Sequence, residues 1–91
     1  MDVIYRIDKD IIYIAVEGRI DASNAAEAEE KIFGIKNDNP GKHTVLDADK
    51  LEYISSAGLR VILRLRKEEP KLAIINVAPD VYEVFDMTGF T

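Results

Sequence analysis

The segment from Thr44 to Lys67 constrains the fold of this 91-residue chain more than any other stretch. It begins with a short strand-like run, passes through the polar cluster Ser55-Ser56-Ala57-Gly58, and continues into a helix with a strong apolar face. A strand followed by such a helix indicates a crossover unit, in which the helix packs on the sheet. The two hydroxyls at the helix start can be caps, anion ligands or phosphate acceptors.

Strand and helix patterns also alternate through the rest of the chain. Residues 3–8 alternate apolar with polar side chains, which is typical of a half-buried strand, and a turn at Lys9-Asp10 follows. The continuous apolar run at 11–16 predicts a strand covered on both sides. A helix capped by Asp21 or Ser23 is expected next, and the helix-breaking residues at 37–41 end it near Lys36. A strand at 42–48 and a helix from the serine cluster to just before Pro70 follow. The last two elements are expected to be a strand at 72–77 and a helix that runs from Pro79 to a left-handed cap at Gly89.

Each predicted helix carries one apolar stripe at spacings of three and four. The order β-β-α-β-α-β-α therefore predicts an α/β, two-layer fold: a mixed sheet with parallel crossovers and helices packed on its face. The length predicts a single domain over residues 1–91. The stripes expected to be buried are Ala25, Ala28, Ile32 and Ile35 in the first helix, Leu59, Ile62, Leu63 and Leu65 in the second, and Val81, Val84 and Phe85 in the last.

Composition excludes several classes of function. A net charge of −5 and a calculated pI near 4.8 argue against nucleic acid as the main partner and favour a protein or a small polar ligand. The chain has no cysteine, so disulfides and thiolate chemistry are excluded. It has neither a signal-peptide pattern nor an apolar stretch long enough to cross a membrane, which predicts a cytoplasmic protein without direct membrane contact.

The serine cluster supports two interpretations. Capping by one serine, worth about 1 kcal/mol, is favoured on spacing alone. The functional alternative is phosphorylation, because a helix start favours a phosphate and the small residues Ala57 and Gly58 leave room for another protein's active site. A phosphoryl group adds about −1.5 to −2 charge and would repel a partner that fits the uncharged face. Nearby acids would reinforce the repulsion: Asp47, Asp49 and Glu52.

Catalysis is the weakest interpretation, and no cofactor is predicted. The single histidine, His43, stands at the entry to a strand with no residue to orient it, and a surface role is favoured. Two carboxylates, Asp47 and Asp49, make a poor Mg²⁺ site alone. The glycines form no phosphate-binding motif. A basic stripe on the second helix is either a solvated face or a docking edge for an acidic partner beside Ser56: Arg60, Arg64 and Lys67.

Four segments in order resemble the STAS domain, typified by bacterial anti-sigma factor antagonists. They are Gly18–Ala22, Val45–Asp49, Leu51–Val61 and Ala78–Phe90. The resemblance implies a STAS-type two-layer fold and a regulatory module that is not an enzyme. It also implies partner switching, in which the unmodified antagonist binds an anti-sigma factor that is a serine kinase, phosphorylation ends the interaction, and a phosphatase restores it.

The same resemblance assigns individual residues. Alignment on Gly58-Leu59 places the phosphoacceptor at Ser56, with Ser55, Ala57, Gly58 and Arg60 flanking it. Asp21 matches the family's loop acid beside the acceptor, and Asp47 matches a strand-end residue below it.

This chain departs from the family pattern in two ways. Ser55 replaces the aspartate of the usual motif, which removes a negative charge relevant to kinase recognition. STAS domains usually continue past the last helix, so Thr91 is expected to be the edge of a fragment from a longer protein. The alternative function is therefore a scaffold or sensor module of a multidomain signalling or transport protein, acting by non-covalent binding of protein, nucleotide or small ligand. Monomer and dimer both stay open.

Overall fold

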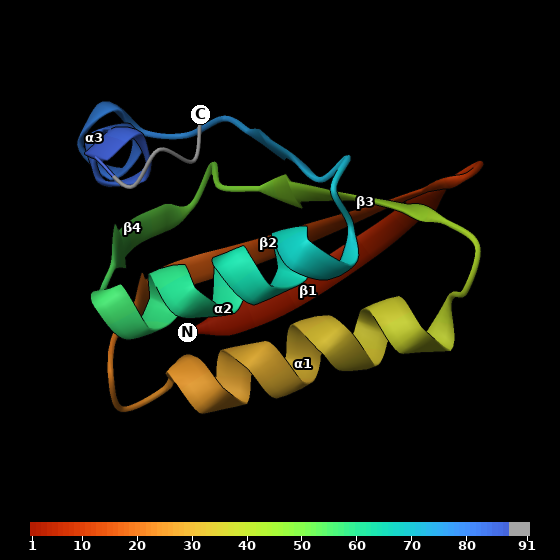
Figure 1. Cartoon of the computed structure of the whole chain (residues 1–91), viewed down its shortest axis with the longest axis horizontal. Coiled ribbons are helices and arrows are strands. Elements are labelled where there is room, and N and C mark those ends of the chain that lie inside the picture. Colours follow the sequence, from red (N-terminus) through yellow and green to blue (C-terminus); the bar gives the residue numbers. More distant parts are fainter. Residues whose placement is uncertain (88–91) are drawn as a thin grey trace.

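The computed structural model describes residues 1–87 and confirms the predicted α/β class (Figure 1). Gly89, the predicted cap of the last helix, lies outside these residues. The elements in chain order are β1 (Asp2–Asp8), β2 (Ile11–Ile20), α1 (Ala25–Asp38), β3 (His43–Asp47), β4 (Leu51–Ile54), α2 (Ser56–Glu68), β5 (Ala73–Ile75) and α3 (Pro79–Met87).

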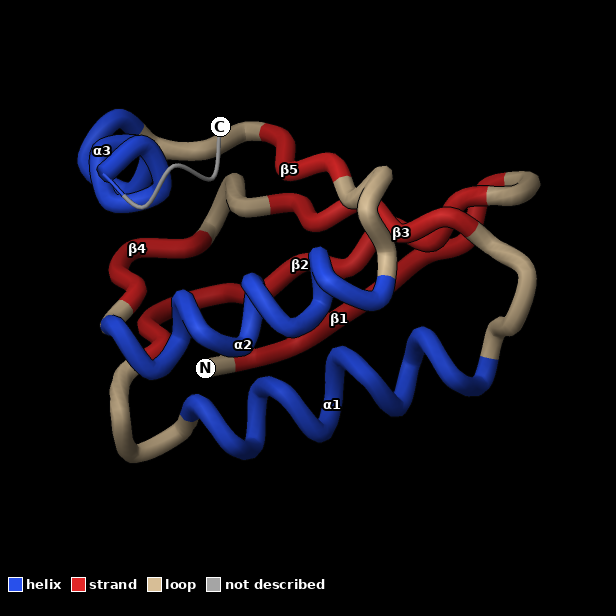
Figure 2. The backbone as a smooth tube through the Cα atoms, in the orientation of Figure 1, coloured by secondary structure: helices blue, strands red, loops and turns tan. Residues whose placement is uncertain are grey.

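Strand β2 is the longest strand, and the mixed sheet is built around it (Figure 2). It pairs antiparallel with β1 through the two-residue turn at Lys9-Asp10, as predicted. Its first half pairs in parallel with β3 and its second half with β4, while β5 lies beside β3. The carboxyl end of β2 therefore meets the end of β4, and the amino end of β2 meets the start of β3.

Strand β4 corrects the predicted order, which has no strand between residue 48 and the second helix. Leu51 and Ile54 are both buried although they are three residues apart, a spacing typical of a helix. The strand tolerates this spacing because its register with β2 shifts between Gly18 and Arg19, as in a β-bulge. Through β4, the chain reaches the carboxyl end of β2 before α2 begins.

The two long helices cover only one face of the sheet (Figure 1). On that face Ile12, Ile14 and Val16 of β2 are buried, and each fully buried isoleucine contributes about 2 kcal/mol. The alternate residues of β2, at 11, 13 and 15, are only half-buried. The prediction that this strand is covered on both sides is therefore wrong, since α1 and α2 contact each other on the same side.

The predicted helix stripes are confirmed in part, since Ile35 and Val84 are only half-buried against the core and Leu63 is exposed. Ala25, Ala28 and Ile32 of α1 are buried, and so are Val81 and Phe85 of α3. In α2, Leu63 is 42% exposed and Val61 is buried in its stead, because Leu63 lies about 100° around the helix from Ile62, at the border of the stripe. The first helix begins after Asn24 rather than with a cap by Asp21 or Ser23.

Candidate functional site

The start of α2 lies at the carboxyl ends of the parallel strands β2 and β4. Ile20 and Ile54, the last residues of these strands, are paired in register. The N–H of Ser55 donates to the carbonyl oxygen of Ile20 over 2.8 Å. Asp21 follows β2 and Ser55 follows β4, so the pairing of these strands brings the two predicted site residues together at the carboxyl end of the sheet.

Ser55 is the cap of α2. Its backbone is extended, with φ −86° and ψ 175°, and its Oγ accepts a hydrogen bond from the N–H of Gly58 over 3.2 Å. Its carbonyl oxygen accepts the N–H of Leu59 over 2.9 Å. Serine and aspartate are about equally good in this position. Ser55 therefore supplies the helix cap that an aspartate would supply, without the negative charge.

Ser56 is the first residue of α2, and its side chain is exposed. Its hydroxyl has no hydrogen-bond partner within residues 1–87. The first turn of a helix has unpaired N–H groups and a partial positive charge, which favour a negative group here. The structure thus separates the two serines: Ser55 is engaged in the cap, while the hydroxyl of Ser56 is accessible to another protein.

Gly58 is small for a reason different from the predicted one. It is buried, and a Cβ on it would lie 2.7 Å from Cγ1 of Ile54 and 2.8 Å from Cγ2 of Ile20. Its size lets α2 approach the sheet and does not leave room for a partner. Ala57 is half-buried and packs against the core, so it also serves packing.

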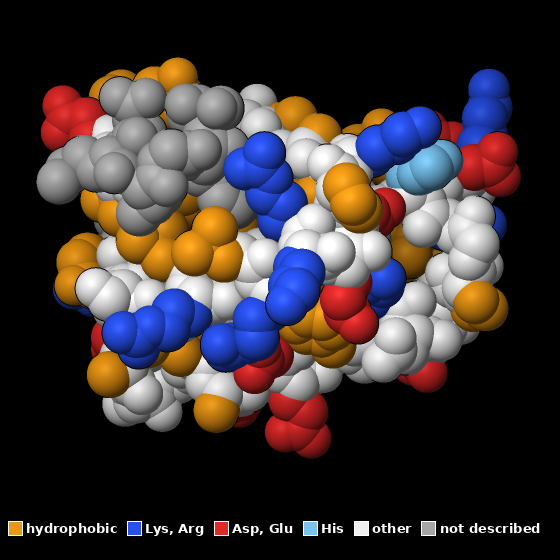
Figure 3. Space-filling view, viewed as in Figure 1, with side chains coloured by type: hydrophobic (Ala, Val, Ile, Leu, Met, Phe, Trp, Pro, Cys, Tyr) orange, Lys and Arg blue, Asp and Glu red, His pale blue; other side chains and the backbone are white. Residues whose placement is uncertain are grey.

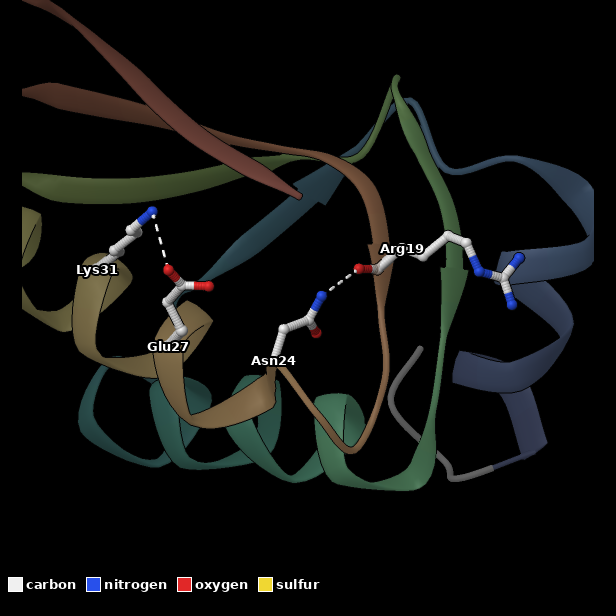
Figure 4. A network of polar contacts seen from close by, with 4 residues as sticks. All are labelled: Arg19, Asn24, Glu27 and Lys31. Atoms are coloured by element: carbon white, nitrogen blue, oxygen red, sulfur yellow. Dashed lines mark hydrogen bonds and ion pairs between the residues drawn. The ribbon is translucent and has the colours of Figure 1, made fainter.

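Asp21 lies in a loop whose conformation is held by hydrogen bonds. Its Oδ1 accepts bonds from the hydroxyl of Ser23 over 2.5 Å and from the N–H of Ser23 over 2.9 Å. The hydroxyl of Ser23 is the main reason that the pKa of Asp21 lies below 3.8, and the backbone N–H of Ser23 and the charge of Arg19 add to the effect. Asn24 holds the other end of the loop, because its side-chain amide donates to the carbonyl of Arg19 over 2.9 Å (Figure 4). A fixed carboxylate therefore lies beside the start of α2.

Arg60 lies one helical turn after Ser56 and is exposed. It has no hydrogen-bond or ion-pair partner in the part of the chain that the structure describes. Further along α2, Arg64 pairs with Glu29 of α1 and Lys67 is exposed. Figure 3 shows Lys and Arg side chains gathered across the face where α2 lies. The predicted basic stripe is thus an exposed surface that begins next to Ser56.

Comparison with known proteins decides the family. The family model of the STAS domain matches residues 2–91. The chain belongs to the STAS domain family. A protein of Bordetella bronchiseptica named as an anti-sigma factor antagonist, BtrV, is 34% identical over 84 residues, which cover 88% of this STAS domain and 72% of BtrV.

Solved structures share the fold of this STAS domain. An anti-sigma factor antagonist from Mycobacterium paratuberculosis superposes with a TM-score of 0.85 at 21% identity, over 97% of this chain and 77% of that one. The antagonist SpoIIAA superposes in its unphosphorylated form with a TM-score of 0.74 at 20% identity, over 98% and 82% of the two chains. In its phosphorylated form, from Bacillus, the TM-score is 0.68 at 18% identity, over 98% and 85%. The predicted family and STAS-type fold are confirmed.

Two other residues that the sequence offered as candidates for the functional site lie far from Ser56 in this STAS domain. Asp47 pairs with Ala15, five residues before Ile20 on β2, or roughly 16 Å along the strand. It lies on the face of the sheet that α1 and α2 do not cover, where its carboxylate accepts bonds from Asp49 and Asn76. His43 pairs with Ile11 at the far end of β2, on the order of 25–30 Å from Ile20, so it cannot act as a base for Ser56.

The structure shows one further pair near the carboxyl ends of β2 and β4 that the sequence did not reveal, on the face of the sheet opposite α2. Arg19 and Tyr53 are register partners on β2 and β4, and the guanidinium of Arg19 lies 4.4 Å from the centre of the Tyr53 ring. Both side chains are exposed. Because the pairing exists only through β4, a sequence analysis without that strand has no signal for it.

The site has no metal centre among the described residues, because no three of their His, Asp or Glu side chains are grouped to hold an ion. Within residues 1–87 no helix is both long and apolar enough to cross a membrane.

Proposed function

We propose that this STAS domain is a cytoplasmic anti-sigma factor antagonist that binds an anti-sigma factor through the start of α2 and is released by phosphorylation of Ser56. The observation that carries the proposal is the exposed, unpaired hydroxyl of Ser56 directly after the capping Ser55. The relatives support the role, since BtrV and SpoIIAA are named as anti-sigma factor antagonists, and SpoIIAA has a phosphorylated form.

The switch is electrostatic. The partner would cover Ser56, the fixed carboxylate of Asp21 and the cation of Arg60, so its surface has to match one negative and one positive charge. A phosphoryl group on Ser56 brings about −1.5 to −2 charge into this surface. That charge repels the negative partner group that faces Arg60 and competes with it for this cation, which lies one turn away on the same helix. The helix start stabilises the phosphate in the free domain, which favours release.

The chain itself performs no chemistry in this proposal. A serine kinase, the anti-sigma factor itself, transfers the γ-phosphoryl group of ATP to Oγ of Ser56; the bond to ADP breaks, ADP leaves, and the hydroxyl proton is lost. A phosphatase returns the free hydroxyl by hydrolysis. The replacement of the motif's aspartate by Ser55 leaves the helix start intact, because Ser55 keeps the cap. Kinase recognition would then rest on the exposed hydroxyl and on the charges of Asp21 and Arg60.

Incubation with ATP and an anti-sigma factor kinase from the same genome, followed by mass spectrometry, tests the proposal. We expect one added phosphoryl group on the native protein and none on Ser56→Ala. Ser55→Ala is the matched control: it loses the cap but keeps the acceptor, and should still be modified. An unmodified native protein, or a phosphoryl group retained in Ser56→Ala, would refute the assignment.

A further inference from the structure

The outer edge of strand β1 is a second surface of this domain that is open to another chain. Within the described residues β1 pairs only with β2, so its other edge is open along Asp2–Asp8. Seven residues give roughly 23 Å of strand. Such an edge presents unpaired N–H and C=O groups that another extended chain can bind.

This edge lacks several of the features that usually protect one, and its acids, Asp2 and Asp8, lie only at its two ends. Its pairing with β2 is continuous from Asp2 to Asp8, without a bulge, and it contains no proline. Arg6, its one basic residue, does not cover the edge, because its guanidinium lies 3.9 Å from the ring centre of Tyr13 on the neighbouring strand. Three of its apolar side chains are largely exposed: Ile4 at 52%, Tyr5 at 53% and Ile7 at 43%.

The register identifies the backbone groups that face outward. The two-residue turn makes Asp8 and Ile11 a hydrogen-bonded pair, and such pairs alternate along an antiparallel ladder. The even-numbered residues of β1 therefore bond to β2. By the same alternation, Val3, Tyr5 and Ile7 direct their N–H and C=O groups to the open edge.

A groove lies next to this edge, between β1 and α1. It has a volume of about 560 Å³ and is lined on one side by Val3 and Tyr5 and on the other by α1. The α1 side has an apolar lower part, at Gly34 and Ile35, and nothing lies within 4 Å of the place where a Cβ on Gly34 would be. Side chains of an added strand can therefore enter this space from the edge.

The charge of the groove defines its occupant. Its charged lining residues are Glu27, Glu30, Lys31 and Asp38. Glu27 and Lys31 pair with each other over 3.5 Å (Figure 4), whereas Glu30 and Asp38 have no ion-pair partner within residues 1–87. The groove thus presents two unpaired carboxylates above an apolar floor. Lys and Arg side chains fit this arrangement, because their stems cover apolar surface while their charges reach the acids.

We propose that the β1–α1 groove binds an extended segment of another protein, added as a strand to the open edge of β1, in which Lys or Arg alternates with apolar residues. The basic side chains enter the groove toward Glu30 and Asp38. The alternate apolar side chains lie on the other face of the sheet, beside the exposed Ile4. This surface involves no residue of the Ser56 site.

A random nonapeptide library displayed on phage and selected against the folded domain tests the proposal. We expect enriched peptides that alternate Lys or Arg with Val, Ile, Thr or aromatic residues. Binding of one enriched peptide should change the amide NMR signals of residues 2–8 and 27–38. Selection of peptides without this alternation, or signal changes confined to other elements, would overturn the proposal.

Two changes separate strand addition from general attraction to an acidic protein. Methylation of alternate backbone nitrogens of the peptide should lower affinity about tenfold in one register and hardly at all in the other, because only one set of N–H groups faces β1. Tyr5→Pro removes one outward N–H of β1 and should also weaken binding, whereas Tyr5→Thr keeps it and should bind. Equal effects of methylation in both registers would contradict strand addition.

The remaining outcomes are also decisive. Glu30→Lys should lower the affinity for the basic peptide about tenfold, and the exposed Glu83→Lys on α3 is the control with the same change in net charge.

A dimer of the domain that the peptide disperses would assign the edge to a second copy of this chain and reject a foreign segment. Ser56→Ala should bind the peptide like the native protein, which keeps this result independent of the proposed switch.

Discussion

Gly58 packs directly on Ile54, so closely that an added Cβ would lie 2.7 Å from Cγ1 of Ile54. Ile54 is buried and β-branched, with little freedom to turn away. This contact sets the distance between α2 and the sheet, and with it the position of Ser55 and Ser56 at the carboxyl end of β4.

Gly58→Ala should lower the free energy of unfolding by about 1–2 kcal/mol, because the added methyl group overpacks a filled core. Gly34→Ala is the matched control: it is also a helical glycine, but nothing lies within 4 Å of its added Cβ. Gly34→Ala should stabilise the domain by about 0.5–1 kcal/mol. Urea denaturation of both variants measures the two effects, and a stabilised Gly58→Ala would contradict the packing argument.

The two serines should differ in stability measurements. Ser55→Ala removes the cap and should cost about 1 kcal/mol, whereas Ser55→Asp keeps the cap and places a negative charge at the helix start, worth about 0.3–1 kcal/mol. Ser56→Ala, with an exposed and unpaired hydroxyl, should lie within about 0.5 kcal/mol of the native protein. A large loss at Ser56 would show that its hydroxyl has a structural role.

Affinity for the anti-sigma factor should separate two variants of Ser56. Ser56→Asp adds charge to the proposed docking surface and should bind more weakly, by about tenfold. Ser56→Ala should bind like the unmodified protein and fail to switch. Isothermal titration calorimetry at two salt concentrations measures the affinity of both variants. The difference in affinity between them should be smaller at high salt, because exposed charges are screened. Equal affinities would argue against an electrostatic switch.

The pH dependence of stability should reveal the hydrogen bonds of Asp21. Its folded pKa is depressed below 3.8, so its contribution is present above that value and is lost as the pH falls through the folded pKa. Ser23→Ala removes the main cause and should raise the pKa of Asp21 toward 3.8. Carbon NMR titration of the Asp21 carboxyl group follows this directly. An unchanged pKa in Ser23→Ala would assign the shift to another group.

Glu69 should be more important for stability than its neighbour Glu68. The carboxylate of Glu69 is 12% exposed and accepts the N–H of the buried Thr44 over 2.8 Å, which ties the end of α2 to the start of β3. Glu69→Ala leaves that N–H without its partner and should cost about 1–3 kcal/mol. Glu68→Ala, at an exposed position, should cost less than about 0.5 kcal/mol. Similar losses in thermal unfolding would contradict this role.

Much of the fold follows from local pattern. The alternation along β1, the turn at Lys9-Asp10, the breakers after α1 and the stripe of α1 each predict an element that the structure contains. These features depend on residues two to four apart, where side-chain direction is set by strand or helix geometry. Strand β4 was not predicted, because its two buried residues have the spacing of a helix. They lie in a strand because β4 pairs with β2 through a β-bulge.

The candidate site, like the fold, was predictable from the sequence only in part. The cluster at Ser55 and Ser56, together with the family motif, was visible in the sequence. The sequence could not tell which serine caps the helix, that the size of Gly58 serves packing, or that Asp47 lies on the other face of the sheet. Each of these depends on the register of strands that are far apart in the chain.

By itself, the sequence determined the α/β class, the helix start at the serine cluster and the family to which the chain belongs, because periodicity, caps and motifs are properties of neighbouring residues. Only the tertiary structure decided that Ser55 is engaged and Ser56 is accessible, and that the edge of β1 is open beside an acidic groove. The physical reason is that burial and pairing are decided by the contacts a residue makes across the sheet, and residue type alone does not specify those contacts.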